Sequence, residues 1–150
     1  MYHSIVKRIS RSAFEDLSDR NIEPLLERSA PDLYHTFAGE HALGGTRHSR
    51  EAFRRWLERL YRLFPELRFD IREVIVSGTP WNTRLALSWT DRGVAADGEP
   101  YENEGIHLLR LKWGRLVELE ANLDTQHLAG TLDRMAAAGI KEAAADPIVG

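Results

Sequence analysis

Apolar residues recur with a helical period in several parts of the chain. Between residues 5 and 17 an apolar side chain returns at every fourth position, as on one face of a helix. A short second helix is expected around Leu25 and Leu26. A longer helix is predicted from Ser49, a suitable N-cap, to Phe64, because its apolar residues are three or four positions apart. The last helix is expected to follow Asp124, whose carboxylate suits an N-cap.

Between the third and last of these helices, apolar and polar residues alternate, which is typical of half-buried strands. The pattern predicts three longer stretches of strand in 67–76, 84–92 and 101–124, the last of them folded into a pair. Residues 33–37 form a further short strand candidate, followed by a loop-like stretch over 40–48. Helices followed by antiparallel strands predict an α+β fold, a curved antiparallel sheet with helices covering one face.

The last strand pair, 101–112 and 115–124, carries the most information because its register can be argued. A two-residue loop at Trp113-Gly114 sets the apolar face of one strand against the polar face of the other. A three-residue loop over 112–114 removes this conflict. We therefore predict that Gly105 opposes Ala121 and that His107 opposes Leu119.

This register predicts a gap on the inner face of the sheet. Gly105 and Ala121 would lie side by side there, with His107 at the edge of the gap. Asn103 and Trp89 share that face, and the parity of the first strand turns His35 inward as well. The gap either opens a small-molecule pocket or admits a bulky helix side chain such as Trp56.

The inward histidines and Asp91 each have two possible interpretations. An inward histidine is either a hydrogen-bonded core residue or a general acid or base, for which its ordinary pKa near 6.5 is suitable. Asp91 has the parity of Trp89 and lies at a strand end, so it is either a carboxylate at the pocket rim or the first loop residue. No element carries two histidines and a carboxylate at metal-binding spacing, so we predict no metal.

The length, composition and charge of the chain exclude several classes of protein. A chain of 150 residues suits one domain, here 1–150 with its core at about 5–140 and a mobile tail after Glu142. There are no cysteines, which excludes disulfides and thiolate catalysis. A net charge of −3 does not favour nucleic-acid binding, and no apolar run is long enough for a bilayer. The N-terminus lacks the apolar core of a signal peptide, so we expect a cytoplasmic protein without membrane partners.

Several short segments, in this order along the chain, resemble the nuclear transport factor 2-like superfamily, and in particular its SnoaL-like polyketide cyclase and ketosteroid isomerase-like branch. The resemblance covers about residues 5–140. The residues that carry it are Asp32-Leu33-Tyr34-His35 with Gly39, Gly45-Thr46, Ser49-Arg50-Glu51-Ala52-Phe53, Phe64-Pro65-Glu66-Leu67, and the stretch from Leu108 to Glu118 followed by Asp124.

The resemblance implies a cone-shaped α+β barrel with a deep pocket between sheet and helices, and homodimers through the outer sheet surface. It also implies chemistry without a cofactor, by cyclases, isomerases and hydrolyases, beside members with no catalysis. In the cyclases an inward histidine and an aspartate on the last two strands exchange protons. His107 resembles that histidine, whereas the aspartate position falls on Ala121.

Two hypotheses of function follow. The first is a cofactor-free enzyme (a cyclase, an isomerase or a lyase) for a small apolar, oxygenated molecule of polyketide-like or steroid-like shape. His107 would be its general acid or base, and His35 would either orient the substrate or stabilise a developing oxyanion. The second is a non-catalytic domain that binds a ligand in the same pocket, which the alanine at the expected carboxylate position favours. The substrate-binding residues that we predict are Trp89, Asp91, Trp56, Tyr61, Gly105, Ala121 and Asn103.

Overall fold

The computed structural model describes residues 1–150, all of the chain. Its α-helices are α1 (Tyr2–Ser18), α2 (Glu23–Arg28), α3 (Arg50–Leu63) and α4 (Thr125–Ala137), and a 3-10 turn, η1, covers Lys141–Ala144. Its strands are β1 (Ser29–Phe37), β2 (Gly45–Arg47), β3 (Arg68–Thr79), β4 (Asn82–Val94), β5 (Pro100–Lys112) and β6 (Arg115–Leu123).

The long helices begin where their capping residues predicted. The hydroxyl of Ser49 accepts a hydrogen bond from the amide of Ala52, and the carboxylate of Asp124 accepts one from the amide of His127. The apolar stripe of α3 is buried, as its spacing predicted. None of the helices combines the length and the apolar character needed to cross a membrane.

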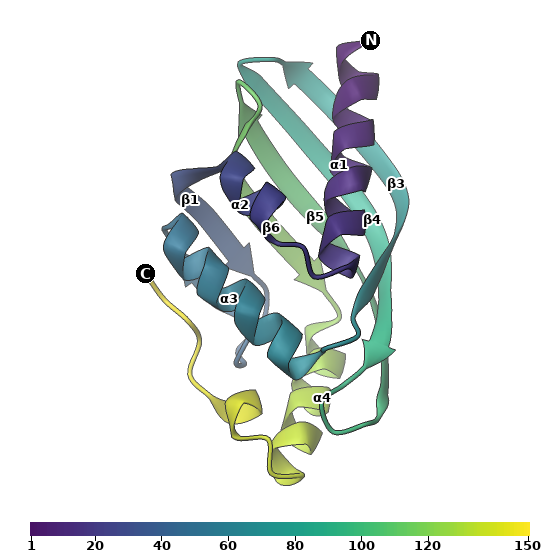
Figure 1. Cartoon of the computed structure of the whole chain (residues 1–150), viewed down its shortest axis with the longest axis vertical. Coiled ribbons are helices and arrows are strands. Elements are labelled where there is room, and N and C mark those ends of the chain that lie inside the picture. The colour runs from purple at the N-terminus through teal and green to yellow at the C-terminus, as the bar shows by residue number, and fades with distance from the viewer.

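The six strands form one curved sheet in the order β2-β1-β6-β5-β4-β3 (Figure 1). Neighbouring strands are antiparallel except for β1 and β6, which are parallel. Helices α1, α2 and α3 lie across one face of the sheet, and α4 lies at its lower end in Figure 1. The α+β class and the helix-covered sheet are confirmed. The sheet is not wholly antiparallel, because the chain returns from β5 through β6 to lie beside β1.

The register predicted for the last hairpin is wrong. Lys112 pairs with Arg115 across a two-residue turn, in which Trp113 and Gly114 both have positive φ angles, 51° and 77°. A β-bulge resolves the conflict between the two faces. Between Arg110 and Leu111 the register shifts, because β6 has one extra residue opposite this point. The bulge shifts the rest of β6 by one position, so that the inward parity is restored without a longer loop.

The bulge changes every pair on which the predicted gap depended. His107 opposes Ala121, and Gly105 opposes Leu123 and, on its other side, Trp89. A Cβ atom on Gly105 would lie 2.7 Å from Cζ2 of Trp89, so the indole ring of Trp89 covers this glycine. Gly105 therefore permits close packing of an aromatic ring and leaves no empty space.

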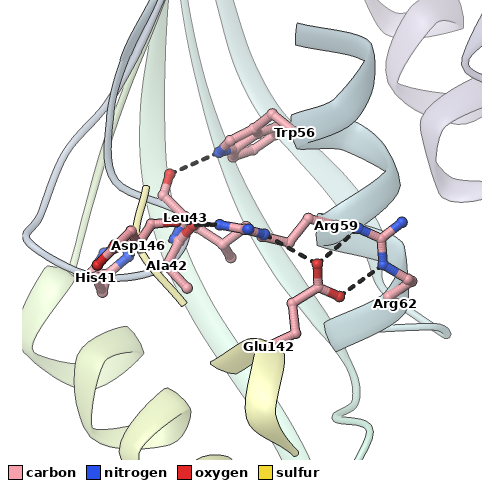
Figure 2. A network of polar contacts seen from close by, with 8 residues as sticks. All are labelled: His41, Ala42, Leu43, Trp56, Arg59, Arg62, Glu142 and Asp146. Atoms are coloured by element: carbon pink, nitrogen blue, oxygen red, sulfur yellow. Dashed lines mark hydrogen bonds and ion pairs between the residues drawn. The ribbon is translucent and has the colours of Figure 1, made fainter. Parts of the chain in front are cut away.

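The C-terminal tail makes specific contacts with α3 and the loop before β2. Glu142 in η1 pairs with Arg59 and Arg62, and Arg59 also donates to the backbone carbonyls of Ala42 and Asp146 (Figure 2). The sequence predicts mobility after Glu142. These contacts favour an ordered tail instead, and limited proteolysis would measure the difference.

Candidate functional site

A cavity of about 300 Å³ lies between the concave face of the sheet and the helices, a volume suited to a small ligand. Of the 33 residues that line it, 26 are hydrophobic, so the few polar groups decide what chemistry it can support. Arg28 at an exposed position and Ser10, whose hydroxyl donates to the carbonyl of Val6, are two of them. Tyr2 and Tyr101 also line the cavity, and their hydroxyl groups are hydrogen-bonded to Thr83 and Asn103. The remaining polar side chains are His35, Asp91 and His107, all of them buried.

His107 points into the cavity from β5 and is held there by two aromatic side chains. The indole N–H of Trp89 donates a hydrogen bond to Nδ1 of His107, and the ring of Phe14 on α1 lies edge-on, 5.3 Å away between centroids. Because Nδ1 accepts this bond, a neutral His107 carries its proton on Nε2, which has no hydrogen-bond partner in the protein. Burial lowers the pKa of His107 to about 3, so the ring is neutral near pH 7.

His35 comes from β1 and has the same protonation pattern. Its Nδ1 accepts a hydrogen bond of 2.8 Å from Nε of Arg47, and its ring packs against Phe53 and Trp56. Burial, and then the charge of Arg47, hold the pKa of His35 well below its usual range. Both histidines are therefore neutral N–H donors on the cavity side, and neither is poised to exchange protons near neutrality.

Asp91 is the ionisable group in the cavity with a pKa near neutrality. Its side chain points inward from β4, is only 5% exposed, and has an Oδ1 atom without a hydrogen-bond partner. Burial raises the pKa of Asp91 to about 7, although backbone N–H groups of Asn103 and of Asp91 itself oppose the shift. A carboxyl group of this kind can take up or release a proton at neutral pH.

Asp91 and His107 lie at separate positions along the cavity. Asp91 pairs with Asn103, four residues before His107 on β5. The rise of a strand and the spacing between strands therefore put the Cα atoms of Asp91 and His107 roughly 14 Å apart. Trp89 lies between them on the same sheet face. A ligand that reaches both groups therefore lies along the Trp89 ring.

The other predicted site residues divide into two groups. Trp89 and Trp56 line the cavity, although the indole N–H of Trp56 is already bound to the carbonyl of Leu43 (Figure 2). Four residues are not part of the cavity wall: Tyr61, Asn103, Gly105 and Ala121.

The Trp89 ring covers Gly105, and the contacts of the other three explain their absence from the wall. The hydroxyl of Tyr61 donates to the carbonyl of Leu17 on α1. The amide of Asn103 donates to the Tyr101 hydroxyl and to the backbone carbonyl of Asp124. Ala121 is fully buried on β6, where it pairs with His107 on β5 and with Phe37 on β1.

Arg47 is a functional candidate that the sequence pattern did not reveal. It lies on β2, a strand of only three residues, too short for any alternation to show which way its side chain points. No group of three or more His, Cys, Asp or Glu side chains is placed to hold a metal ion. The buried ionisable groups that face the cavity are thus one carboxyl group and two neutral imidazoles, on a mostly apolar wall.

Comparison with known proteins agrees with this architecture. A search of curated proteins finds no match. Among solved structures, an NTF2-like protein of unknown function from Burkholderia pseudomallei has a TM-score of 0.74 at 25% identity, over 83% of this chain and 95% of that one. TerC, crystallised with polyporic acid, has a TM-score of 0.70 at 21% identity, over 81% and 92% of the two chains.

A third structure, from Jannaschia species, is provisionally named a SnoaL-like polyketide cyclase. It has a TM-score of 0.65 at 18% identity, over 79% of this chain and 84% of that one. At these identities the structural likeness establishes the fold. The sequence itself matches the family model of the SnoaL-like domain over residues 11–119, most of the chain. The chain therefore belongs to the SnoaL-like domain family, within the nuclear transport factor 2-like superfamily.

Proposed function

We propose that this protein is a cofactor-free acid–base enzyme for a small, largely apolar, oxygenated substrate, with cyclase, isomerase or hydrolyase chemistry. The observation that carries the proposal is the carboxyl group of Asp91, whose Oδ1 atom has no hydrogen-bond partner, in an apolar cavity. Its pKa of about 7 keeps a large fraction of the carboxylate available at neutral pH, together with enough basicity to take a proton from carbon. We therefore assign the role of general base to Asp91, in place of His107.

The two histidines have a different role in this proposal. Each accepts a hydrogen bond at Nδ1 and so presents an N–H group at Nε2. A neutral imidazole N–H can stabilise negative charge that develops on a substrate oxygen, as the neutral histidine of triosephosphate isomerase does. When Asp91 removes a proton from carbon, the negative charge spreads through a conjugated ring system, and an oxygen at its far end would accept a hydrogen bond from one of these donors.

The shape of the cavity supports an apolar ring compound as substrate. Aromatic and aliphatic side chains from the sheet and helices surround the few polar groups, and the volume of about 300 Å³ fits a molecule of two or three fused rings. TerC, which has the same fold, was crystallised with polyporic acid, and this is compatible with such a ligand class. A cytoplasmic location and a homodimer belong to the proposal as predictions.

Proton exchange on a model ketone tests the role of Asp91 without knowledge of the natural substrate. The protein is incubated with 1-tetralone in D₂O, and NMR follows deuterium entry next to the carbonyl group. We expect exchange above background that rises with pH through about 7, because the carboxylate is the active form. Asp91→Asn should slow this exchange by about 10²- to 10⁴-fold.

His107→Gln is the matched variant, because glutamine can still accept from Trp89 and donate into the cavity. It should slow exchange far less than Asp91→Asn and keep the inflection near pH 7. Loss of the inflection in His107→Gln, with its retention in Asp91→Asn, would show that the histidine is the titrating base.

A non-catalytic ligand-binding domain is the second candidate, and Ala121 favours it. The resemblance to the cyclases places their aspartate at this position, where this chain has only a methyl group. This candidate predicts saturable binding of apolar ring compounds that are recovered unchanged. Mass spectrometry of a bound compound after long incubation decides between the two, since any converted product excludes a purely binding role.

A further inference from the structure

Arg47 is a fully buried cation without an acidic partner. Its guanidinium group donates to the backbone carbonyls of Gly44, Gly45 and Ile148 at 2.8–3.1 Å and, through Nε, to Nδ1 of His35. It also lies 5.6 Å from the centre of the Trp56 ring. These contacts satisfy its N–H groups, but none of them neutralises its charge.

The surroundings of Arg47 do not supply a compensating negative charge either. The charged group that affects it most is Arg59, a second cation. The carboxylate of Glu142 pairs with Arg59 and Arg62, and it forms no ion pair with Arg47 (Figure 2). The tail segment that covers Arg47 contributes the backbone carbonyl of Ile148. Burial lowers the pKa of Arg47 only to about 10, so the positive charge persists at neutral pH.

His35 connects this charge to the cavity. One side of the imidazole accepts from Arg47, and the other side presents Nε2–H, which has no partner in the protein. The ring is fixed between Phe53 and Trp56, with centroid separations of 4.5 and 4.6 Å. A charge-assisted hydrogen bond at Nδ1 makes the opposite N–H a stronger donor, and the low dielectric of the cavity increases its effect on an anion.

We propose that Arg47 and His35 together form an oxyanion site, so that the ligand of this protein is an apolar ring compound with an acidic enol or phenol group bound as its anion. The ligand hydroxyl releases its proton to bulk water, and the resulting oxygen anion accepts a hydrogen bond from Nε2 of His35. Arg47 is a positioning residue here, because it acts on the ligand through His35. The site refines the substrate class of the proposed function, yet it does not require Asp91 to be a base.

The ionisation of bound 4-nitrophenol tests this site, because its phenolate and phenol forms have different absorption spectra. All measurements use Asp91→Asn as the background, so that proton transfer to Asp91 cannot contribute. In that background Arg47→Gln should lower the ratio of bound phenolate to bound phenol at pH 7 by about tenfold or more, which is one unit in the pKa of the ligand.

Arg59→Gln is the control variant, since it removes hydrogen bonds to the same loop and tail but does not touch His35. It should leave the ratio within about twofold of the background protein. Equal ratios in Arg47→Gln and Arg59→Gln, or no saturable binding of 4-nitrophenol, would overturn the proposal. Failure of the tetralone exchange alone would overturn only the role of Asp91.

A measurement on the unmutated protein keeps the test valid if Arg47→Gln does not fold. ¹⁵N NMR of the imidazole should show His35 protonated at Nε2 and neutral between pH 5 and 8. Addition of 4-nitrophenol should move the Nε2–H resonance downfield. A proton on Nδ1, or a resonance that does not respond to the phenol, would exclude the oxyanion site.

Discussion

Asp91 shows how one buried side chain couples chemistry to stability. In the folded state Asp91 keeps its proton up to about pH 7, whereas an ordinary aspartate loses its proton near pH 3.8. The folded state therefore binds more protons between these values, and the stability that Asp91 contributes below this window is lost as the pH rises through about 7. His107 has the opposite sign, because its pKa is depressed and its contribution is lost as the pH falls.

A comparison of two proteins isolates the contribution of Asp91. The free energy of unfolding of the native protein minus that of Asp91→Asn should fall by roughly 4 kcal/mol between pH 4 and 8. Both proteins keep the buried histidines, so the opposing effect of His107 cancels in the difference. Urea unfolding at several pH values measures it. A difference that does not change with pH would mean that Asp91 ionises as an exposed aspartate does.

The position of a functional side chain could be predicted from the sequence better than its protonation state. Asp91 and the two histidines could be placed on the inner face because each lies on a strand long enough to show alternation. The protonation of the histidines could not be predicted, because it depends on Trp89 and Arg47, which are distant in sequence. The pattern alone therefore indicates acid–base groups, although burial keeps both imidazoles neutral.

At the scale of elements, the bulge in β6 explains why the register predicted for the last hairpin was wrong. The helices were predictable, because caps such as Ser49 and Asp124 act within one turn. The register of the last hairpin was not, because one extra residue between Leu116 and Glu118 changes which side chains face each other without any change in composition. The sheet was correctly expected to be curved, but the pair expected at its inner gap was wrong.

Gly105→Ala tests the revised role of this glycine. The new methyl group would lie 2.6 Å from the backbone oxygen of Asn122 and 2.7 Å from Cζ2 of Trp89, so the indole has to move away from His107. We expect a loss of about 1–3 kcal/mol in the free energy of unfolding, as for overpacking in a core.

Gly130→Ala is the control for this substitution. Gly130 lies within α4, and no atom lies within 4 Å of the place that a methyl group on it would take, so alanine should stabilise the protein by up to about 1 kcal/mol. Chemical denaturation of both variants provides the comparison. A neutral Gly105→Ala would mean that Trp89 does not depend on the glycine.

At the scale of the whole molecule, Glu142 joins the C-terminal tail to α3. Glu142→Gln removes the charge that Arg59 and Arg62 share and should lower the free energy of unfolding by about 1 kcal/mol. It should also speed tryptic cleavage after Lys141, because η1 is held less firmly. Glu104→Gln, which breaks an exposed pair with Arg72, should change neither quantity measurably. Equal cleavage rates in both variants would show that Glu142 does not hold the tail.

The outer face of the sheet carries the prediction of a homodimer. Ile75 lies on β3, and Ile106 and Leu108 lie on β5, on the other side of β4. Each is about half exposed, at 56%, 49% and 44%. Light scattering should give twice the mass of one chain, and Leu108→Glu should reduce it to that of a monomer, because a charge then enters an apolar interface. A monomeric native protein would contradict the prediction.

The four tryptophans lie in two different environments, one buried and one exposed. Trp56 and Trp89 are buried against the cavity, whereas Trp81 and Trp113 pack against each other at exposed turns, and only Trp113 of these two also lines the cavity. Aqueous quenchers such as iodide reach only the second pair, so the emission that survives them comes from the first. The indole bonded to His107 thus makes the protein its own fluorescent reporter of anything that enters the cavity.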